Sequence, residues 1–143
     1  MQIRPMHITD HPSLIALLQE TEGVTLREAD SLEATARYLD RNPDLSFVAV
    51  QKDEIIGCIM SGHDGRRGYL QHLIVQPAYR GHGIARTLVH TALNALARIG
   101  IYKTHCFVFR SNDAAQGFWE SMGWERRDQT LMYSYNASDD PNI

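Results

Sequence analysis

The chain has 143 residues, of which 43% are hydrophobic and 22% charged, and its formal net charge is −3. This size suits one domain, and the composition allows a hydrophobic core without disulfides or metal, since Cys58 and Cys106 stand apart in apolar runs. The negative net charge argues against broad nucleic-acid binding, so we expect no nucleic-acid partner. No apolar run reaches the ~20 residues of a membrane span, and the N-terminus lacks a signal-peptide pattern. We therefore expect a cytoplasmic protein with no membrane partner.

The N-terminal third predicts one short strand and two helices. Residues 3–5 suit an edge strand, and an amphipathic run follows until Gly23 ends it. Asp30 and Glu33 stand three residues apart, which is the spacing of a capping box, and they predict a second helix that runs to about Asp40. Two helices are therefore expected before the β-rich centre.

The centre of the chain predicts a sheet interrupted by one long helix. Residues 47–50 and 55–60 flank a turn and predict an antiparallel hairpin, and residues 69–75 are apolar enough for a central strand. Apolar residues then recur at helical spacing over 84–99, before a last apolar strand at 104–109. A strand, a crossover helix and a further strand predict a parallel pair with a right-handed connection.

The C-terminal part predicts a short helix, two closing strands and a tail. Asn112 is a candidate cap for the helix, and residues 124–126 and 131–135 have the composition of strands. Residues 136–143 are polar, so we expect them to fray. The sequence therefore predicts a single domain over residues 1–135 followed by a tail over 136–143.

The junction between the strand at 69–75 and the next helix predicts an anion site. Arg80, Gly81 and Gly83 stand just before the helix, whose first N–H groups lack partners and whose dipole is positive at this end. The glycines allow close approach of a pyrophosphate, although a tight turn that needs glycine is an alternative interpretation. A dinucleotide fingerprint would need a third glycine where Arg86 stands, and no nucleotide P-loop occurs.

Two motifs resemble those of the GNAT family of N-acetyltransferases. The family's acetyl-CoA signature, Arg/Gln-x-x-Gly-x-Gly/Ala, is matched by Arg80, Gly83 and Ala85. A second family element, an Asn followed by Ala-x-x-Phe-Tyr-x-x-x-Gly-Phe, resembles Asn112 with the run from Ala115 to Trp124. Because the motifs occur in the family's order, the resemblance extends over essentially the whole chain.

This resemblance implies an α/β fold with a mixed, mostly antiparallel central sheet, flanking helices and a parallel pair of strands that splay apart. Acetyl-CoA is then the acetyl donor, with its pantetheine arm in the split and its pyrophosphate on the turn. The turn over residues 62–68 is also similar to that of a bacterial subgroup of uncharacterised members. The cofactor-binding residues that the resemblance implies are Leu73, Ile74, Val75, Arg80, Gly81, His82, Gly83, Ile84, Ala85, Asn112, Phe118 and Trp119.

The catalytic groups depart from the family pattern. The family's frequent acid is a Tyr where this chain has Trp119, whose indole N–H donates a hydrogen bond but is no acid. Regular alternation along the strand puts Tyr69 and Gln71 on the site face and His72 on the opposite face, so we expect Tyr69 and Gln71 to relay a proton through water. A β-bulge would reverse this parity and present His72 as the base instead.

The resemblance implies an N-acetyltransferase that moves the acetyl group from acetyl-CoA to a primary amine of a small molecule or peptide, and it allows a homodimer. Two alternatives stay open. One is a catalytically weak or inactive acyl-CoA sensor, because Trp119 replaces the acid; the other is an unrelated phosphate-binding or interaction module. We expect no metal site, since His7 and His11 straddle a strand-to-helix turn.

Overall fold

The protein is built on a five-stranded sheet with the strand order β1-β2-β3-β4-β5. The computed structural model describes all residues from 1 to 143. The strands are β1 (Gln2–Pro5), β2 (Phe47–Gln51), β3 (Glu54–His63), β4 (Gly68–Val75) and β5 (Thr104–Cys106). Neighbouring strands are antiparallel except β4 and β5, which are parallel. The expected mixed, mostly antiparallel α/β fold is therefore confirmed.

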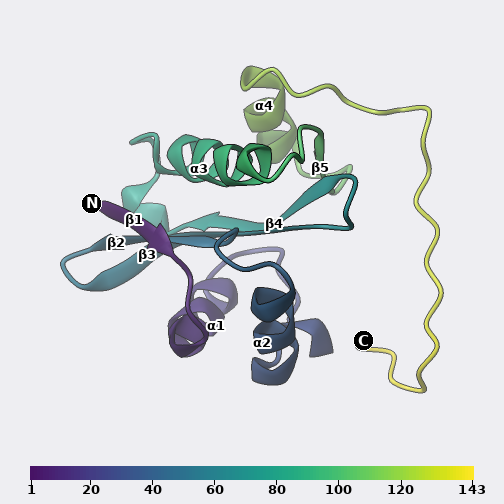
Figure 1. Cartoon of the computed structure of the whole chain (residues 1–143), viewed down its shortest axis with the longest axis horizontal. Coiled ribbons are helices and arrows are strands. Elements are labelled where there is room, and N and C mark those ends of the chain that lie inside the picture. The colour runs from purple at the N-terminus through teal and green to yellow at the C-terminus, as the bar shows by residue number, and fades with distance from the viewer. The chain divides into compact units, whose positions relative to one another are not determined.

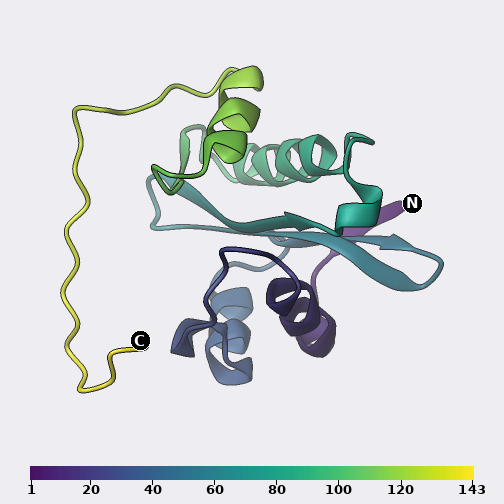
Figure 2. The ribbon, with the colours of Figure 1, turned by 180° about the vertical axis from the view of Figure 1, so that it is seen from behind.

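The chain divides into two compact units, which we call the sheet unit, Met1–Cys106, and the C-terminal unit, Phe107–Ile143. The helices of the sheet unit are α1 (His11–Gln19), α2 (Leu32–Arg41) and α3 (Ile84–Arg98). Figure 1 shows α3 on one face of the sheet and α1 with α2 on the other, and the view from behind in Figure 2 shows the same layers. No helix is both long and apolar enough to cross a membrane.

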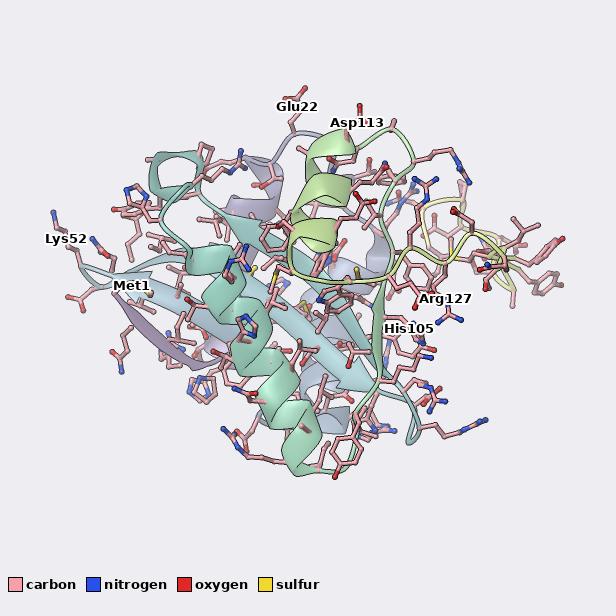
Figure 3. All side chains as sticks on the ribbon, turned by 90° about the horizontal axis from the view of Figure 1, so that it is seen from above. Met1, Glu22, Lys52, His105, Asp113 and Arg127 are labelled. Carbon is pink, nitrogen blue, oxygen red and sulfur yellow. The ribbon has the colours of Figure 1, made fainter.

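The core lies between the sheet and α3. Leu88 and Leu96 of α3 are 0% exposed, as are Ile56 and Ile59 of β3. The apolar positions of α3 recur at helical spacing and so form one stripe toward the sheet. Figure 3 shows α3 lying over the sheet, seen from the α3 side. Full burial of each such side chain contributes about 1.5–3 kcal/mol, so this contact holds α3 firmly against β3 and β4.

Strand β4 is interrupted by a bulge. Cys58 of β3 pairs with Ile74 and Met60 pairs with Gln71, so one β3 residue lies opposite two β4 residues, His72 and Leu73. His72 has φ 50°, in the left-handed region that a non-glycine residue adopts at a cost of about 1–2 kcal/mol. The expectation of regular alternation through β4 is therefore wrong at His72, and the bulge considered as the alternative is present.

Strands β4 and β5 pair over a short stretch and then separate. The register joins Gly68 to Thr104 and Leu70 to Cys106, after which no strand pairs with residues 71–75 on this edge. Glycine is needed at position 68, because a Cβ there would lie 2.7 Å from Thr104 Oγ1 and 2.9 Å from Leu96 Cδ1. The strand expected at 104–109 thus ends at Cys106, and it leaves the expected splayed pair.

The C-terminal unit contains one helix, α4 (Asp113–Ser121). Asn112 caps it as expected, since its side-chain oxygen accepts a hydrogen bond from Ala115 N at 3.0 Å. The closing strands expected at 124–126 and 131–135 are not formed. These residues make no ladder with another strand, and Leu131 is 70% and Tyr135 92% exposed. Apolar and aromatic residues form a strand only where a neighbour supplies backbone hydrogen bonds.

Candidate active site

The turn between β4 and α3 is built around two glycines. Gly81 and Gly83 both have φ 80°, and a Cβ at either position would meet no atom within 4 Å. Their backbone conformation alone accounts for glycine at both positions, since other residues rarely adopt it. The space beside both residues is nevertheless open, so a ligand can approach the main chain of the turn.

The N-terminus of α3 follows this turn directly. Gly83 is its N-cap residue and accepts hydrogen bonds from Thr87 N at 3.0 Å and Thr87 Oγ1 at 2.9 Å. The first N–H groups of a helix have no partner within it, and the helix dipole adds positive charge there. Residues 76–98 contain three arginines and no Asp or Glu. The turn is therefore suited to phosphate groups.

The free edge of β4 leads into this turn. Residues 73–75 lie beyond the last pair with β5, so their main-chain groups on that edge have no strand partner. Arg80 Nε donates to Val75 O at 3.0 Å, which fixes the arginine side chain at the end of β4. An extended ligand arm along this edge would run from main-chain hydrogen-bonding groups toward a positively charged turn.

A cavity of about 370 Å³ lies on the other face of the sheet, beside α2. Gln71 and His72 of β4 and Met60 of β3 line it, together with residues of α2 and of the short 3-10 helix η2 (Glu28–Asp30). Because the bulge turns His72 toward the side that Gln71 already faces, two consecutive β4 residues line one cavity. The volume is at the small end of the range for ligand sites, about 300–1,000 Å³.

His72 is held by a carboxylate within this cavity. Its Nε2 lies 2.7 Å from Asp30 Oδ1, and the two side chains are 27% and 9% exposed. Since an ionised carboxylate only accepts hydrogen bonds, Nε2 carries the hydrogen, and in the neutral imidazole Nδ1 then keeps a lone pair. Nδ1 makes no hydrogen bond in the structure. The pair therefore presents an oriented imidazole that is able to accept a proton.

Asp30 is free for this role because another residue caps α2. The cap is Ser31, whose Oγ accepts from Ala34 N at 3.1 Å, so the capping box expected from Asp30 and Glu33 is wrong. Asp30 Oδ2 instead accepts from Arg27 N at 2.8 Å, and this bond closes η2. The carboxylate is thus fixed on its own segment before it contacts His72.

The bulge is also anchored from β3. The thiol of Cys58 donates to the carbonyl oxygen of His72 at 3.2 Å. Burial raises the pKa of the Cys58 thiol to about 12, so it stays protonated near neutral pH and remains a donor. Backbone and side chain of His72 are therefore held by two different segments, which together offset the cost of its left-handed conformation.

The two residues expected to relay a proton are separated in the structure. Gln71 lines the cavity beside His72. Tyr69 does not line it; its ring lies 5.8 Å from the ring of His105, its partner on β5. Asp30 was missed as a site residue from the sequence because it lies 42 residues before His72 and looks like an ordinary helix cap.

The remaining cofactor-binding residues expected from the sequence belong to the C-terminal unit. Asn112 caps α4, and the rings of Phe118 and Trp119 lie 5.1 Å apart in an edge-to-face arrangement. Trp119 also contacts the ring of Trp124 at 4.5 Å. These aromatic side chains therefore pack against one another within their own unit.

A second cavity of about 380 Å³ lies beside α1, lined by Arg4, Asp10 and Glu54 among others. Its arginine is already paired, since both terminal nitrogens of Arg4 donate to Asp10 at 2.9 Å. No residue of the β4 bulge lines it. Its arginine and Asp10 thus serve each other as partners, and we assign the chemistry to the cavity that contains His72.

The fold has known counterparts. The model of the acetyltransferase (GNAT) family matches residues 12–124. An acetyltransferase of Sodalis glossinidius is 33% identical over 141 residues, which cover 98% of each protein. The chain belongs to the GNAT acetyltransferase family. It is an N-acetyltransferase that uses acetyl-CoA as its acetyl donor, as expected from the two sequence motifs.

Solved structures of GNAT proteins share this architecture. The PaiA N-acetyltransferase of Thermoplasma acidophilum, in complex with coenzyme A, superposes with a TM-score of 0.80 at 24% identity, covering 89% of this chain and 91% of that one. The NatC complex bound to Gag peptide and CoA is similar with a TM-score of 0.71 at 28% identity, covering 90% and 87%. The likeness extends over most of each chain, and the residues of the β4 bulge and of the turn lie within the range 12–124 that the family model matches.

Proposed function

We propose that this N-acetyltransferase acetylates a primary amine of a small molecule or peptide that enters the cavity beside α2. One observation carries the proposal: the β4 bulge presents His72, oriented by Asp30, to a cavity large enough for a small amine. The donor would lie on the opposite side of β4, along its free edge. The two substrates would then approach each other at the β4 bulge.

The residues of the turn and of β4 fit acetyl-CoA. The open main chain at Gly81, His82 and Gly83 and the first N–H groups of α3, at Ile84 and Ala85, would hold the pyrophosphate, with Arg80 adding charge. The main chain of residues 73–75 would pair with the pantetheine arm, as an extended ligand pairs with a free strand edge. The positive φ of Gly81 and Gly83 requires glycine with or without a bound pyrophosphate. The assignment therefore rests on the open space beside the turn and on the absence of Asp and Glu from residues 76–98.

The chemistry that we assign to the chain is proton removal from the amine. Acetyl-CoA supplies an activated thioester, so the new C–N bond forms as the C–S bond breaks, and the CoA thiolate that leaves would take its proton from water. Nδ1 of His72 would accept the proton that the amine loses, while Asp30 holds the imidazole in the required tautomer. The side-chain amide of Gln71 would position the amine or a bridging water beside it. Tyr69 would act more remotely, through a water relay.

The test compares single substitutions in stable proteins. A thiol-release assay with pooled amines first finds an acceptor, and mass spectrometry confirms the acetylated product. We then expect His72→Gln to lower kcat about 10²- to 10⁴-fold and Gln71→Leu about 10-fold, with little effect on the KM for acetyl-CoA. If His72→Gln leaves kcat unchanged while Tyr69→Phe or Gln71→Leu lowers it, the water relay is the base and the assignment of His72 is wrong.

A further inference from the structure

The cavity beside α2 has a second charged side, formed by the helix itself. Arg37 and Arg41 line it together with Gln71 and His72. The two arginines stand four residues apart on α2, which places their side chains on one face, a turn apart. Neither guanidinium makes a hydrogen bond or an ion pair in the structure. The cavity therefore has two unpaired positive charges on its helix side.

The fold gives only a partial structural reason for this pair. Arg41 lies in the last turn of α2, where a positive charge favours the helix dipole. Arg37 stands four residues after Glu33 and three before Asp40, whose opposite charges offset its repulsion from Arg41, but no ion pair joins it to either carboxylate. An anion bound between the two guanidinium groups would remove this repulsion and use their donors.

Tyr38 provides an independent sign of a ligand in the same place. Its side chain lines the cavity, and its buried phenol oxygen has no hydrogen-bond partner. Burial raises the pKa of Tyr38 to about 12, so the hydroxyl stays neutral and remains a donor. A buried hydroxyl without a partner is costly and rare in native proteins. A small movement on ligand binding would let this hydroxyl donate to the same anion.

The other side of the cavity has the opposite character. Asp30 and Glu28 come from η2, and Asp30 orients His72. A ligand that complements both sides carries an amine toward His72 and an anion toward Arg37 and Arg41. At about 370 Å³ the cavity holds one molecule of amino-acid size.

We propose that the acceptor is a small amine that also carries an anionic group, a carboxylate or a phosphate, bound by Arg37 and Arg41 while the amine faces His72. The proposal rests on the proposed function, because it takes this cavity as the acceptor site. It assigns acceptor selection to α2, whose residues do no chemistry themselves.

Matched pairs of amines test the charge requirement. Tyrosine is compared with tyramine and histidine with histamine, since the members of each pair differ only in the carboxylate. Phosphoethanolamine is compared with ethanolamine in the same way. The pair with the larger ratio of kcat/KM, with the anionic group over without it, shows whether the site prefers a carboxylate or a phosphate. We expect the wild type to favour the anionic member by about 10- to 100-fold in kcat/KM, the range for hydrogen bonds to a charged group. Equal or better use of the member without the anionic group in every pair would overturn the proposal.

Variants then assign the preference to the arginines. Arg37→Gln with Arg41→Gln should remove the preference, mainly through KM for the anionic amine, and Arg37→Lys with Arg41→Lys should restore part of it. Arg98→Gln, an exposed arginine in the last turn of α3, is the matched control and should keep the full ratio. A ratio that survives in the Arg37→Gln, Arg41→Gln protein would also overturn the proposal.

The design separates this proposal from the proposed function. If the amines without an anionic group are acetylated as well as those with one and His72→Gln abolishes both activities, only the anion requirement fails. If acetylation of every amine is insensitive to His72→Gln, the acceptor site lies elsewhere and both fail. Melting temperatures of all variants, measured with the rates, show that the exposed substitutions leave the fold intact.

Discussion

Gly83 offers a clean test of the phosphate site, because aspartate and asparagine have the same shape and differ in charge. Either residue fits without a clash, since a Cβ at Gly83 meets nothing within 4 Å. Either also carries the same backbone strain at φ 80°, about 1–2 kcal/mol. The difference between Gly83→Asp and Gly83→Asn therefore isolates one negative charge at the N-cap of α3.

The size of the effect follows from Coulomb's law. A carboxylate about 6 Å from one phosphate charge costs about 0.7 kcal/mol at a dielectric constant near 80 and about 2.8 kcal/mol near 20. Gly83 is exposed, so screening favours the lower part of this range, but the pyrophosphate carries more than one charge. We expect Gly83→Asp to bind acetyl-CoA at least about tenfold more weakly than Gly83→Asn, a difference of about 1.4 kcal/mol or more.

Calorimetric titration measures this difference directly. Acetyl-CoA is titrated into both variants at low and high salt, and the gap should shrink as salt screens the charge. S-acetyl-pantetheine, which lacks the pyrophosphate, is the control ligand and should bind both variants alike. Equal affinities of the two folded variants for acetyl-CoA would remove the pyrophosphate from this turn and refute the reasoning.

Two further predictions concern the sheet unit. Burial alone would raise the pKa of Asp10, but the hydrogen bonds that it accepts from Arg4 and from His7 N lower it below the usual 3.8. The Arg4–Asp10 pair therefore stabilises the fold above pH about 4, and this stabilisation is lost as the pH falls through the pKa of Asp10 in the folded protein. In urea unfolding at pH 7, we expect Asp10→Asn to be about 1.5–3 kcal/mol less stable than wild type. A difference in the free energy of unfolding that stayed the same in acid would contradict the lowered pKa of Asp10. Gly68→Ala places a Cβ against Thr104 and Leu96 and should cost about 1–3 kcal/mol, which is roughly 3–10 °C in Tm. This loss should shrink in a Thr104→Ala background, and no change in Tm would show that β5 moves aside freely.

The elements with strong local signals were predictable from the sequence. Helix α3 has an uninterrupted apolar period and a glycine turn before it, and both the helix and the turn are present. Residues 131–135 show the limit of such patterns. Their apolar and aromatic composition matches a strand, but the structure gives them no neighbouring strand, and pairing with a neighbour is a property of the whole fold.

The candidate base was harder to predict, because it depends on contacts between distant segments. Whether His72 or its neighbours face the cavity is decided by one extra residue in the pairing of β3 with β4. No residue type in β4 predicts this bulge, because a positive φ is usually indicated by a glycine and the residue that adopts it here is His72. Asp30, 42 residues away, reads locally as a helix cap, and only the folded chain brings it to His72.

Chemical rescue tests the role of His72 most directly. His72→Gly removes the imidazole and suits the left-handed backbone at this position, so the variant should fold and leave a space for a small base. If His72 is the base, His72→Gly should lose at least about 100-fold in kcat, and added imidazole should restore part of the rate. His72→Gln should gain nothing from imidazole. Full activity of His72→Gly without imidazole, or equal stimulation of both variants by it, would contradict the assignment of His72 as the base.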